Sequence, residues 1–121
     1  MPKLIERTPA PEKLFLVYVN QDAEEDGAVE MELEGLCEAA GGEVVGSVRQ
    51  RLGKPFRATY IGPGKVEELK AYVADTAAET VVVDVELSGT QIRNLEEAIN
   101  HRVIDRTQLI LDIFARRAQS R

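Results

Sequence analysis

The segment from Thr59 to Leu69, TYIGPGKVEEL, combines residue types that are well suited to bind an anion. Gly62 and Gly64 leave the backbone unshielded by side chains, and Lys65 adds a positive charge. The segment opens a predicted helix. The first N–H groups of a helix have no partners within it and lie at the positive end of its dipole. These features together predict a phosphate site, for a nucleotide or for an RNA backbone.

The segment lacks the complete motifs of nucleotide-binding proteins. A P-loop requires glycine at the position of Thr59 and a hydroxyl side chain at that of Val66. A dinucleotide-binding loop requires a third glycine where Glu67 stands. Pro63 also removes one N–H group from the turn. A tight turn with a solvated Lys65 is therefore the alternative to a phosphate site.

Charges are segregated along the chain of 121 residues, whose net charge is -6. Residues 21–48 include nine acidic and no basic side chains, whereas residues 49–65 include five basic and no acidic ones. Because the local field decides whether a phosphate can approach, the second stretch predicts contacts with an RNA backbone. A solvated charged face is the alternative. Tyr60, in the same stretch, could stack on a base or pack beside the turn. The candidate RNA-binding residues are Arg49, Arg51, Lys54, Arg57 and Lys65.

Composition excludes several other classes of site. Cys37 is the only cysteine and His101 the only histidine, so an internal disulfide and a His/Cys zinc cluster are excluded. The cysteine usage favours a reducing cytoplasm. No apolar run is long enough to span a bilayer, so we expect no membrane partner. We expect one domain with a single core.

The apolar pattern predicts alternating strands and helices after a loose N-terminal tail of residues 1–13. Residues 14–19 and 80–85 are continuously apolar, which is typical of strands buried on both faces, whereas residues 43–52 end in polar side chains, as an edge strand does. Helical connections imply a parallel sheet with the most apolar strands at its centre. We therefore predict an α/β fold with a small four-stranded parallel sheet in the order 2-1-3-4, flanked by helices like half of a flavodoxin fold. The fourth strand is predicted at 102–105, and the helices at 22–40, at 65–77, from Ser88 onward and at 107–118.

Acidic side chains lie at or just past the ends of the predicted strands, where open parallel sheets bind ligands. Helix capping is one interpretation, with Gln91 completing a capping box begun by Ser88 and Gln108 completing one begun by Asp105. The other is a magnesium site like that of receiver domains, with Asp84 as phosphoacceptor. The predicted fold lacks the fifth strand that carries the lysine of a receiver. The acidic residues in question are Asp22, Asp84, Glu86 and Asp105.

The last predicted helix has a mostly apolar face. Leu111 falls on the side opposite that face and is expected to be exposed, as lone leucines often are, or to mark where further chain packs. The residues predicted to be buried are Leu109, Ile110, Ile113 and Phe114.

Two stretches resemble the N-terminal domain of HflX, a translation-factor-class GTPase. They are TYIGPGKVEELKAYV at 59–73 and LSGTQIRNLEEAINHRVIDRTQLILDIFARRAQSR at 87–121. The resemblance runs from Leu14 to the end and identifies 14–121 as an HflX-type N-terminal α/β domain. Two positions depart from the family pattern. Pro63 stands where a small polar or basic residue is usual, and Gly89 stands where proline is frequent.

The resemblance implies a ribosome-associated role. Proteins of this family bind the large ribosomal subunit and split or rescue stalled ribosomes, often under stress. In the family, a helical linker and a G domain follow the N-terminal domain, and neither is expected within this chain. The chain has no P-loop, so it is not expected to be an enzyme alone, whereas its parent is expected to be a GTPase. GTP and Mg²⁺ would belong to that G domain, and no cofactor is expected here.

Three functional hypotheses follow. The leading one is a non-catalytic binding and regulatory domain that contacts rRNA of the large subunit through the five basic residues and controls the G domain. The alternative is a weak adenine-nucleotide-binding or ATPase unit that uses the Gly62-Pro63-Gly64-Lys65 turn and Asp84. The third is an interaction domain whose Leu111 side docks on the G domain.

Overall fold

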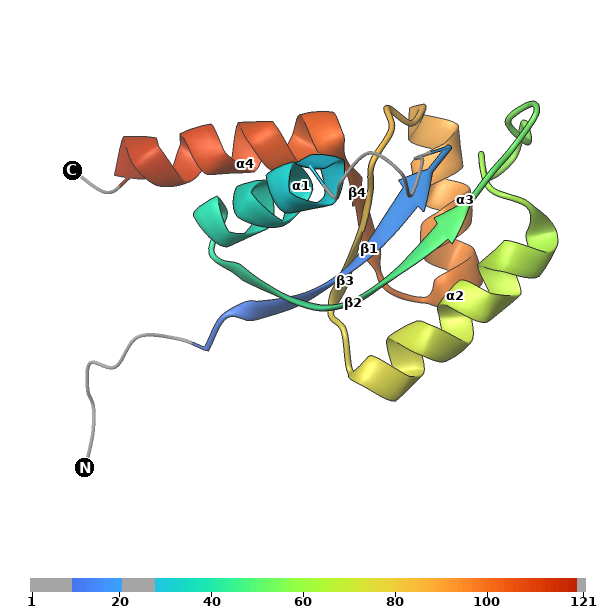
Figure 1. Ribbon diagram of the computed structural model, residues 1–121, viewed down its shortest axis with the longest axis horizontal. Helices are drawn as coiled ribbons and strands as arrows, with labels where there is room; N and C mark the ends of the chain where they lie inside the picture. Colours follow the sequence, from blue (N-terminus) through green and yellow to red (C-terminus); the bar gives the residue numbers. More distant parts are fainter. Residues whose placement is uncertain (1–9, 21–27, 120–121) are drawn as a thin grey trace.

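The computed structural model describes residues 10–20 and 28–119, and in them strands and helices alternate (Figure 1). All strand pairings are parallel, and the order β2-β1-β3-β4 confirms the predicted order. Within these residues, no helix is both long and apolar enough to cross a bilayer. The elements are β1 (Glu12–Val19), α1 (Ala28–Ala39), β2 (Gly42–Gln50), α2 (Pro63–Thr76), β3 (Thr80–Val83), α3 (Gly89–Ile99), β4 (Arg102–Asp105) and α4 (Arg106–Gln119).

The sheet separates two apolar layers. Successive side chains of β1 point to opposite faces: Phe15, Val17 and Val19 pack with α2 and α3, whereas alternate residues pack with α1 and α4. Figure 1 shows α1 and α4 on one side of the sheet and α2 and α3 on the other. Burial on both faces explains why β1 is continuously apolar and central.

β2 forms an edge of the sheet, as its polar end predicted. Its pairing with β1 shifts register after Leu14, where Val44 and Gly46 face consecutive β1 residues. Gly46 is required there because a Cβ at this position would lie 2.7 Å from the ring of Phe15. The bulge thus lets a large core ring pass close to the edge-strand backbone.

Several boundaries differ from the prediction. β1 begins at Glu12 instead of Leu14, because backbone pairing with β2 continues past the apolar run. The predicted tail therefore ends before residue 12, and its first nine residues lie outside the described part. α2 begins at Pro63, with Gly62 as N-cap, because proline suits the first position of a helix. The first six residues of the predicted 22–40 helix also lie outside the described part.

α4 confirms most of its predicted apolar face. Leu109 and Ile113 are buried and Leu111 is exposed, but Phe114 is 62% exposed, so its predicted burial was wrong. The last turns of α4 extend past the end of α1, which leaves little core for that ring to enter (Figure 1). The predicted cap is also partly different: Asp105 Oδ1 accepts the Gln108 N–H, but the Gln108 side chain donates to Asp112.

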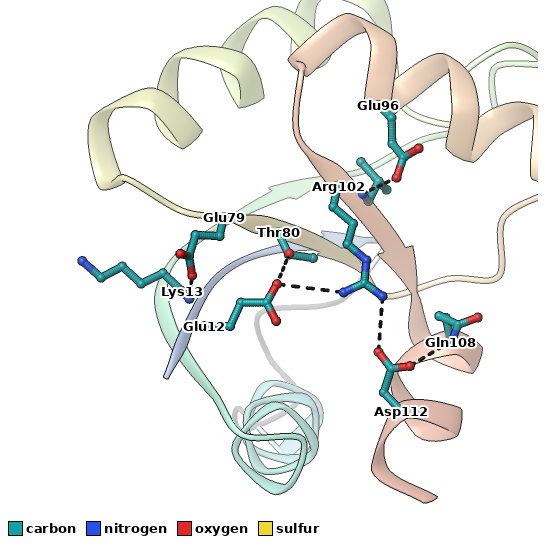
Figure 2. Close-up of polar contacts among 9 residues, drawn as sticks. Glu12, Lys13, Glu79, Thr80, Glu96, Arg102, Gln108 and Asp112 are labelled. Carbon is teal, nitrogen blue, oxygen red and sulfur yellow. Dashed lines mark hydrogen bonds and ion pairs between the residues drawn. The ribbon is translucent and has the colours of Figure 1, made fainter. Parts of the chain in front are cut away.

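The edge of the sheet that carries the amino ends of the strands is closed by paired polar groups (Figure 2). Arg102 lies 3.9 Å from Glu12 and 3.6 Å from Asp112, so it links β4 to β1 and α4. The Thr80 hydroxyl donates to the same Glu12 carboxylate. Because these charges satisfy one another, the opposite, carboxyl edge is where ligand-binding groups should be sought.

Candidate functional site

A loop of residues 51–61, which we call the basic loop, lies at the carboxyl edge between β2 and α2 (Figure 1). Beside it the surface is hollowed by about 330 Å³. The loop contributes one wall of this hollow, and the first turn of α2 contributes the other. The lining residues are Phe56, Arg57, Ala58, Thr59, Pro63, Val66 and Glu67.

Carboxamide side chains hold the basic loop at both ends and in its middle. Asn20 Oδ1, at the end of β1, accepts the Leu52 N–H at 2.6 Å, and Gln50 Oε1 accepts the Gly62 N–H at 3.0 Å. From α3, Asn94 Nδ2 donates to the carbonyl of Ala58 at 2.9 Å. Gln91 Nε2 adds longer contacts with the carbonyls of Phe56 and Arg57, at 3.4 and 3.3 Å. The loop is therefore fixed to two strands and one helix.

Gln91 has two roles. Its backbone N–H donates to the Ser88 hydroxyl, and its Oε1 accepts the Ser88 N–H at 3.0 Å, so the predicted capping box is confirmed. The same amide turns its nitrogen toward the basic loop. The start of α3 and the position of the loop are thus set by one side chain.

The basic loop ends in a strained turn around Tyr60. Phe56 and Tyr60 exchange two backbone hydrogen bonds, of 2.9 and 2.8 Å, and the Ile61 N–H donates to the Thr59 carbonyl at 2.7 Å. Tyr60 has a φ of 66°, which costs a non-glycine residue roughly 1–3 kcal/mol. Its ring is partly buried against the core of the α2 and α3 layer. Of the two predicted roles, the tyrosine packs beside the turn, and the exposed ring is that of Phe56.

The glycine turn offers fewer donors than its sequence suggests. The Gly62 N–H is taken by Gln50, and Pro63 has none. Gly64 and Lys65 retain backbone N–H groups with no acceptor in the described part of the chain, and a Cβ at Gly64 would meet nothing within 4 Å. Two donors at the start of α2 therefore face an open surface, while Gly62 is buried.

The structure does not bring the five predicted basic residues onto one surface. Lys54 and Arg57 are exposed, and neither forms an ion pair with any residue the structure describes. Lys65 Nζ lies 3.0 Å from Glu68 and its side chain is 18% exposed. Arg49 stacks on Tyr18, 5.4 Å from the ring centre, and so points to the α1 and α4 layer. Arg51 is exposed next to the end of β2.

The other half of the carboxyl edge holds a closed set of charges, which we call the ionic cluster: Asp84, Arg106 and Glu32. Arg106 lies 2.6 Å from Asp84 Oδ1 and 2.9 Å from Glu32 Oε2, so it ties α4 to β3 and α1. The Asp84 side chain is only 2% exposed. Burial raises the pKa of Asp84, although the Arg106 hydrogen bond opposes that shift.

The acidic residues at this edge do not form a metal site in the described part of the chain, where no three potential ligands are grouped. Asp105 is buried and accepts backbone N–H groups from Leu87 and Gln108, both at 2.9 Å. It is a structural cap, as predicted. Glu86 is exposed, and Asp22 lies outside the described residues. The geometry of Asp84 and Asp105 gives no support to the receiver-like interpretation.

Sequence reasoning missed the amide residues and Phe56. Asn20, Gln50 and Asn94 follow or flank regular elements without any motif around them. An amide directly after a buried strand is a weak pointer, since such positions often hold a neighbouring loop. Which loop each amide reaches depends on contacts across 12 to 36 residues, which no local pattern encodes.

A model of the family described as GTP-binding GTPase N-terminal matches residues 29–115. Proteins named GTPase HflX are similar to most of the chain. The one from Caldanaerobacter subterraneus subsp. tengcongensis is 46% identical over 110 residues, which are 91% of this chain and 26% of that protein. The Escherichia coli protein is 38% identical over 117 residues, which are 97% of this chain and 28% of that protein. The chain spans about a quarter of the length of these curated relatives.

Solved structures share the fold. SsGBP in complex with GDP matches with a TM-score of 0.67 at 23% identity, over 90% of this chain and 31% of that one. A GTP-binding protein from Sulfolobus solfataricus in complex with GDP matches with a TM-score of 0.62 at 22% identity, over 85% and 30%. These identities establish the fold alone. The family model covers most of the chain and the HflX relatives nearly all of it, so the chain belongs to the GTP-binding GTPase N-terminal family, as an HflX-type N-terminal domain.

Proposed function

We propose that this domain is a non-catalytic module that helps an HflX-type GTPase to bind the large ribosomal subunit, by contacting rRNA phosphates. The observation that carries the proposal is the state of Lys54 and Arg57. Both are exposed on a loop that four amide side chains hold in place, and neither forms an ion pair within the described residues. Cations without partners on an ordered loop are available to a phosphate backbone.

The start of α2 adds to this surface. The N–H groups of Gly64 and Lys65 have no acceptor among the described residues and lie at the positive end of the helix dipole. Arg51 and Lys65 extend the positive charge on either side of the basic loop. Arg49 is the weakest of the five candidates, because it stacks on Tyr18 on the other face of the sheet. Contacts of this kind position a protein on RNA without reading its sequence.

We place GTP hydrolysis, with its GTP and Mg²⁺, in a G domain of the parent protein. The basis is the name GTPase HflX, carried by relatives of which this chain matches about a quarter. The exposed Leu111 and Phe114 of α4 offer an apolar face through which the domain can restrain that G domain. Adding the chain to an isolated G domain should then change its rate of GTP hydrolysis, and an unchanged rate would count against this regulatory role.

Co-sedimentation with large ribosomal subunits tests the RNA contact. We expect the double variant Lys54→Glu/Arg57→Glu to lose most of its binding. We also expect the slope of log affinity against log salt concentration to flatten by about 2, since two phosphate contacts are removed. The matched control is Lys13→Glu/Lys70→Glu, which changes net charge equally at exposed lysines away from the basic loop. Equal binding by the two double variants would reject this surface.

A further inference from the structure

We propose that the hollow beside the basic loop receives one unstacked base of single-stranded RNA, with the ring of Phe56 as its stacking partner. This inference rests on the proposed function, and it adds a base contact to the phosphate contacts. It concerns an aromatic side chain that is 44% exposed at the rim of an apolar hollow, next to cations that lack partners within the described residues.

Phe56 is held in place although it is exposed. Its backbone N–H and carbonyl are both bonded to Tyr60, at 2.9 and 2.8 Å, and its carbonyl also receives Gln91. One edge of the ring rests on Gly62, where a Cβ would lie 3.2 Å from the ring carbon Cε1. A side chain at Gly62 would push the ring away. The ring therefore offers a fixed surface, and binding against it costs little conformational entropy.

The chemistry of the hollow suits a base. Ala58, Pro63 and Val66 supply apolar walls, and Thr59 and Glu67 supply polar atoms that can bond to a base edge. Its volume of about 330 Å³ is at the lower end of the range for ligand pockets, which favours one base over a larger group.

Charge complementarity favours RNA over an apolar peptide. A peptide side chain could fill the hollow, but it would bring nothing to balance Lys54 and Arg57. In RNA, the phosphates on either side of the inserted base supply that negative charge. Bases inside a duplex are stacked and cannot enter, so the ligand must be a single-stranded loop, bulge or end.

A fluorescent reporter can be placed at the proposed contact because the chain contains no tryptophan. In Phe56→Trp, a single-stranded RNA of about eight nucleotides should quench the emission saturably, since a stacked base quenches indole. The matched control is Phe114→Trp, which places the reporter at an exposed aromatic position on α4. We expect it to show no saturable quenching. Duplex RNA of the same composition should leave both variants unquenched.

Affinity measurements separate stacking from packing. Phe56→Leu keeps an apolar side chain against Gly62 but removes the aromatic face. We expect its affinity for the single-stranded RNA to fall about fivefold to a hundredfold, with an unchanged salt slope. Phe56→Tyr should bind as the wild type does. Lys54→Glu/Arg57→Glu should instead flatten the salt slope.

Each outcome decides the inference. If the wild type binds large subunits and Phe56→Leu binds single-stranded RNA equally well, base stacking is rejected while the proposed function stands. If the wild type binds neither subunits nor RNA, both are rejected. Quenching of Phe56→Trp by ATP alone at the same nucleotide concentration would assign the hollow to a free nucleotide and overturn the RNA assignment, as would equal quenching by duplex RNA.

Discussion

The two halves of the carboxyl edge use charge in opposite ways. On the α1 and α4 side, Arg106 joins Asp84 and Glu32, and the Asp84 carboxylate is 2% exposed. On the α2 and α3 side, Lys54 and Arg57 point outward without an ion-pair partner among the described residues. The first arrangement spends its charges inside the protein, whereas the second keeps them available.

The comparison teaches where stability and binding reside. A buried pair is costly to break, because its loss leaves a charge with little solvent to replace the partner. Exposed charges on a loop contribute little to folding. The ionic cluster should therefore matter for stability and the basic loop for binding, although both lie at the same edge. Three predictions test this division, in order of decreasing effect.

The largest effect is expected from Arg106→Ala. It removes the guanidinium that lies 2.6 Å from the buried Asp84, and we expect the free energy of unfolding to fall by about 3 kcal/mol. Urea unfolding followed by circular dichroism measures this difference. Arg93→Ala is the control, since that arginine is exposed on α3 and lacks an ion-pair partner in the described chain. A similar loss in both variants would contradict a special role for the cluster.

The loss in Arg106→Ala should depend on pH. Burial already raises the pKa of Asp84, and removing Arg106 raises it further. A carboxyl group whose pKa is higher in the folded than in the unfolded state binds its proton more tightly when folded, so its contribution to stability falls as pH rises between the two values. The gap between variant and wild type should therefore narrow from pH 7 toward pH 5. A gap that is constant over this range would show that ionised Asp84 is not the cause.

A smaller and opposite effect is expected from Gly64→Ala. Nothing lies within 4 Å of the added Cβ, so the variant should gain about 0.5–1 kcal/mol of stability from higher helix propensity. The methyl group should also hinder approach of a phosphate to the start of α2, so binding to large subunits should weaken. Gly35→Ala, in α1, has equally open surroundings and should gain stability without losing binding. Unweakened binding by Gly64→Ala would remove that turn from the RNA surface.

The smallest effect on stability is expected from Glu68→Ala. The pair with Lys65 is at the surface, so the free energy of unfolding should change by less than about 0.5 kcal/mol. Release of Lys65 should instead steepen the salt dependence of subunit binding by up to about 1. Asp75→Ala removes the same charge from a later turn of α2 and serves as the control. Identical salt slopes for both variants would exclude Lys65 from the contact.

Much of the fold could be predicted from local patterns. The apolar runs of β1 and β3 placed both strands at the centre of the sheet, and the polar end of β2 placed it at an edge. Burial is a property that a strand's own residues reveal, because both faces of a central strand must be apolar. The misassigned Phe114 shows the limit, since periodicity selects a helix face but cannot tell where the neighbouring layer ends.

The candidate site could be predicted only in part. The glycine turn and the basic stretch were visible as residue types, but their partners were not. Gln50 occupies the Gly62 N–H, Glu68 pairs with Lys65, and Tyr18 holds Arg49 on the opposite face. Each of these contacts changes how available a candidate residue is to a ligand.

The sequence by itself determined the strand order, the helix caps at Ser88 and Asp105, and membership of the HflX-type domain family, because these depend on periodicity, local hydrogen bonding and motifs. Only the tertiary structure decided which cations are balanced internally and which remain exposed. A side chain two residues along an edge strand points to the opposite layer after a single register shift, and an amide from a distant helix fixes a loop that has no regular structure of its own. Charge availability is thus a property of the packed edge and not of the residues that compose it.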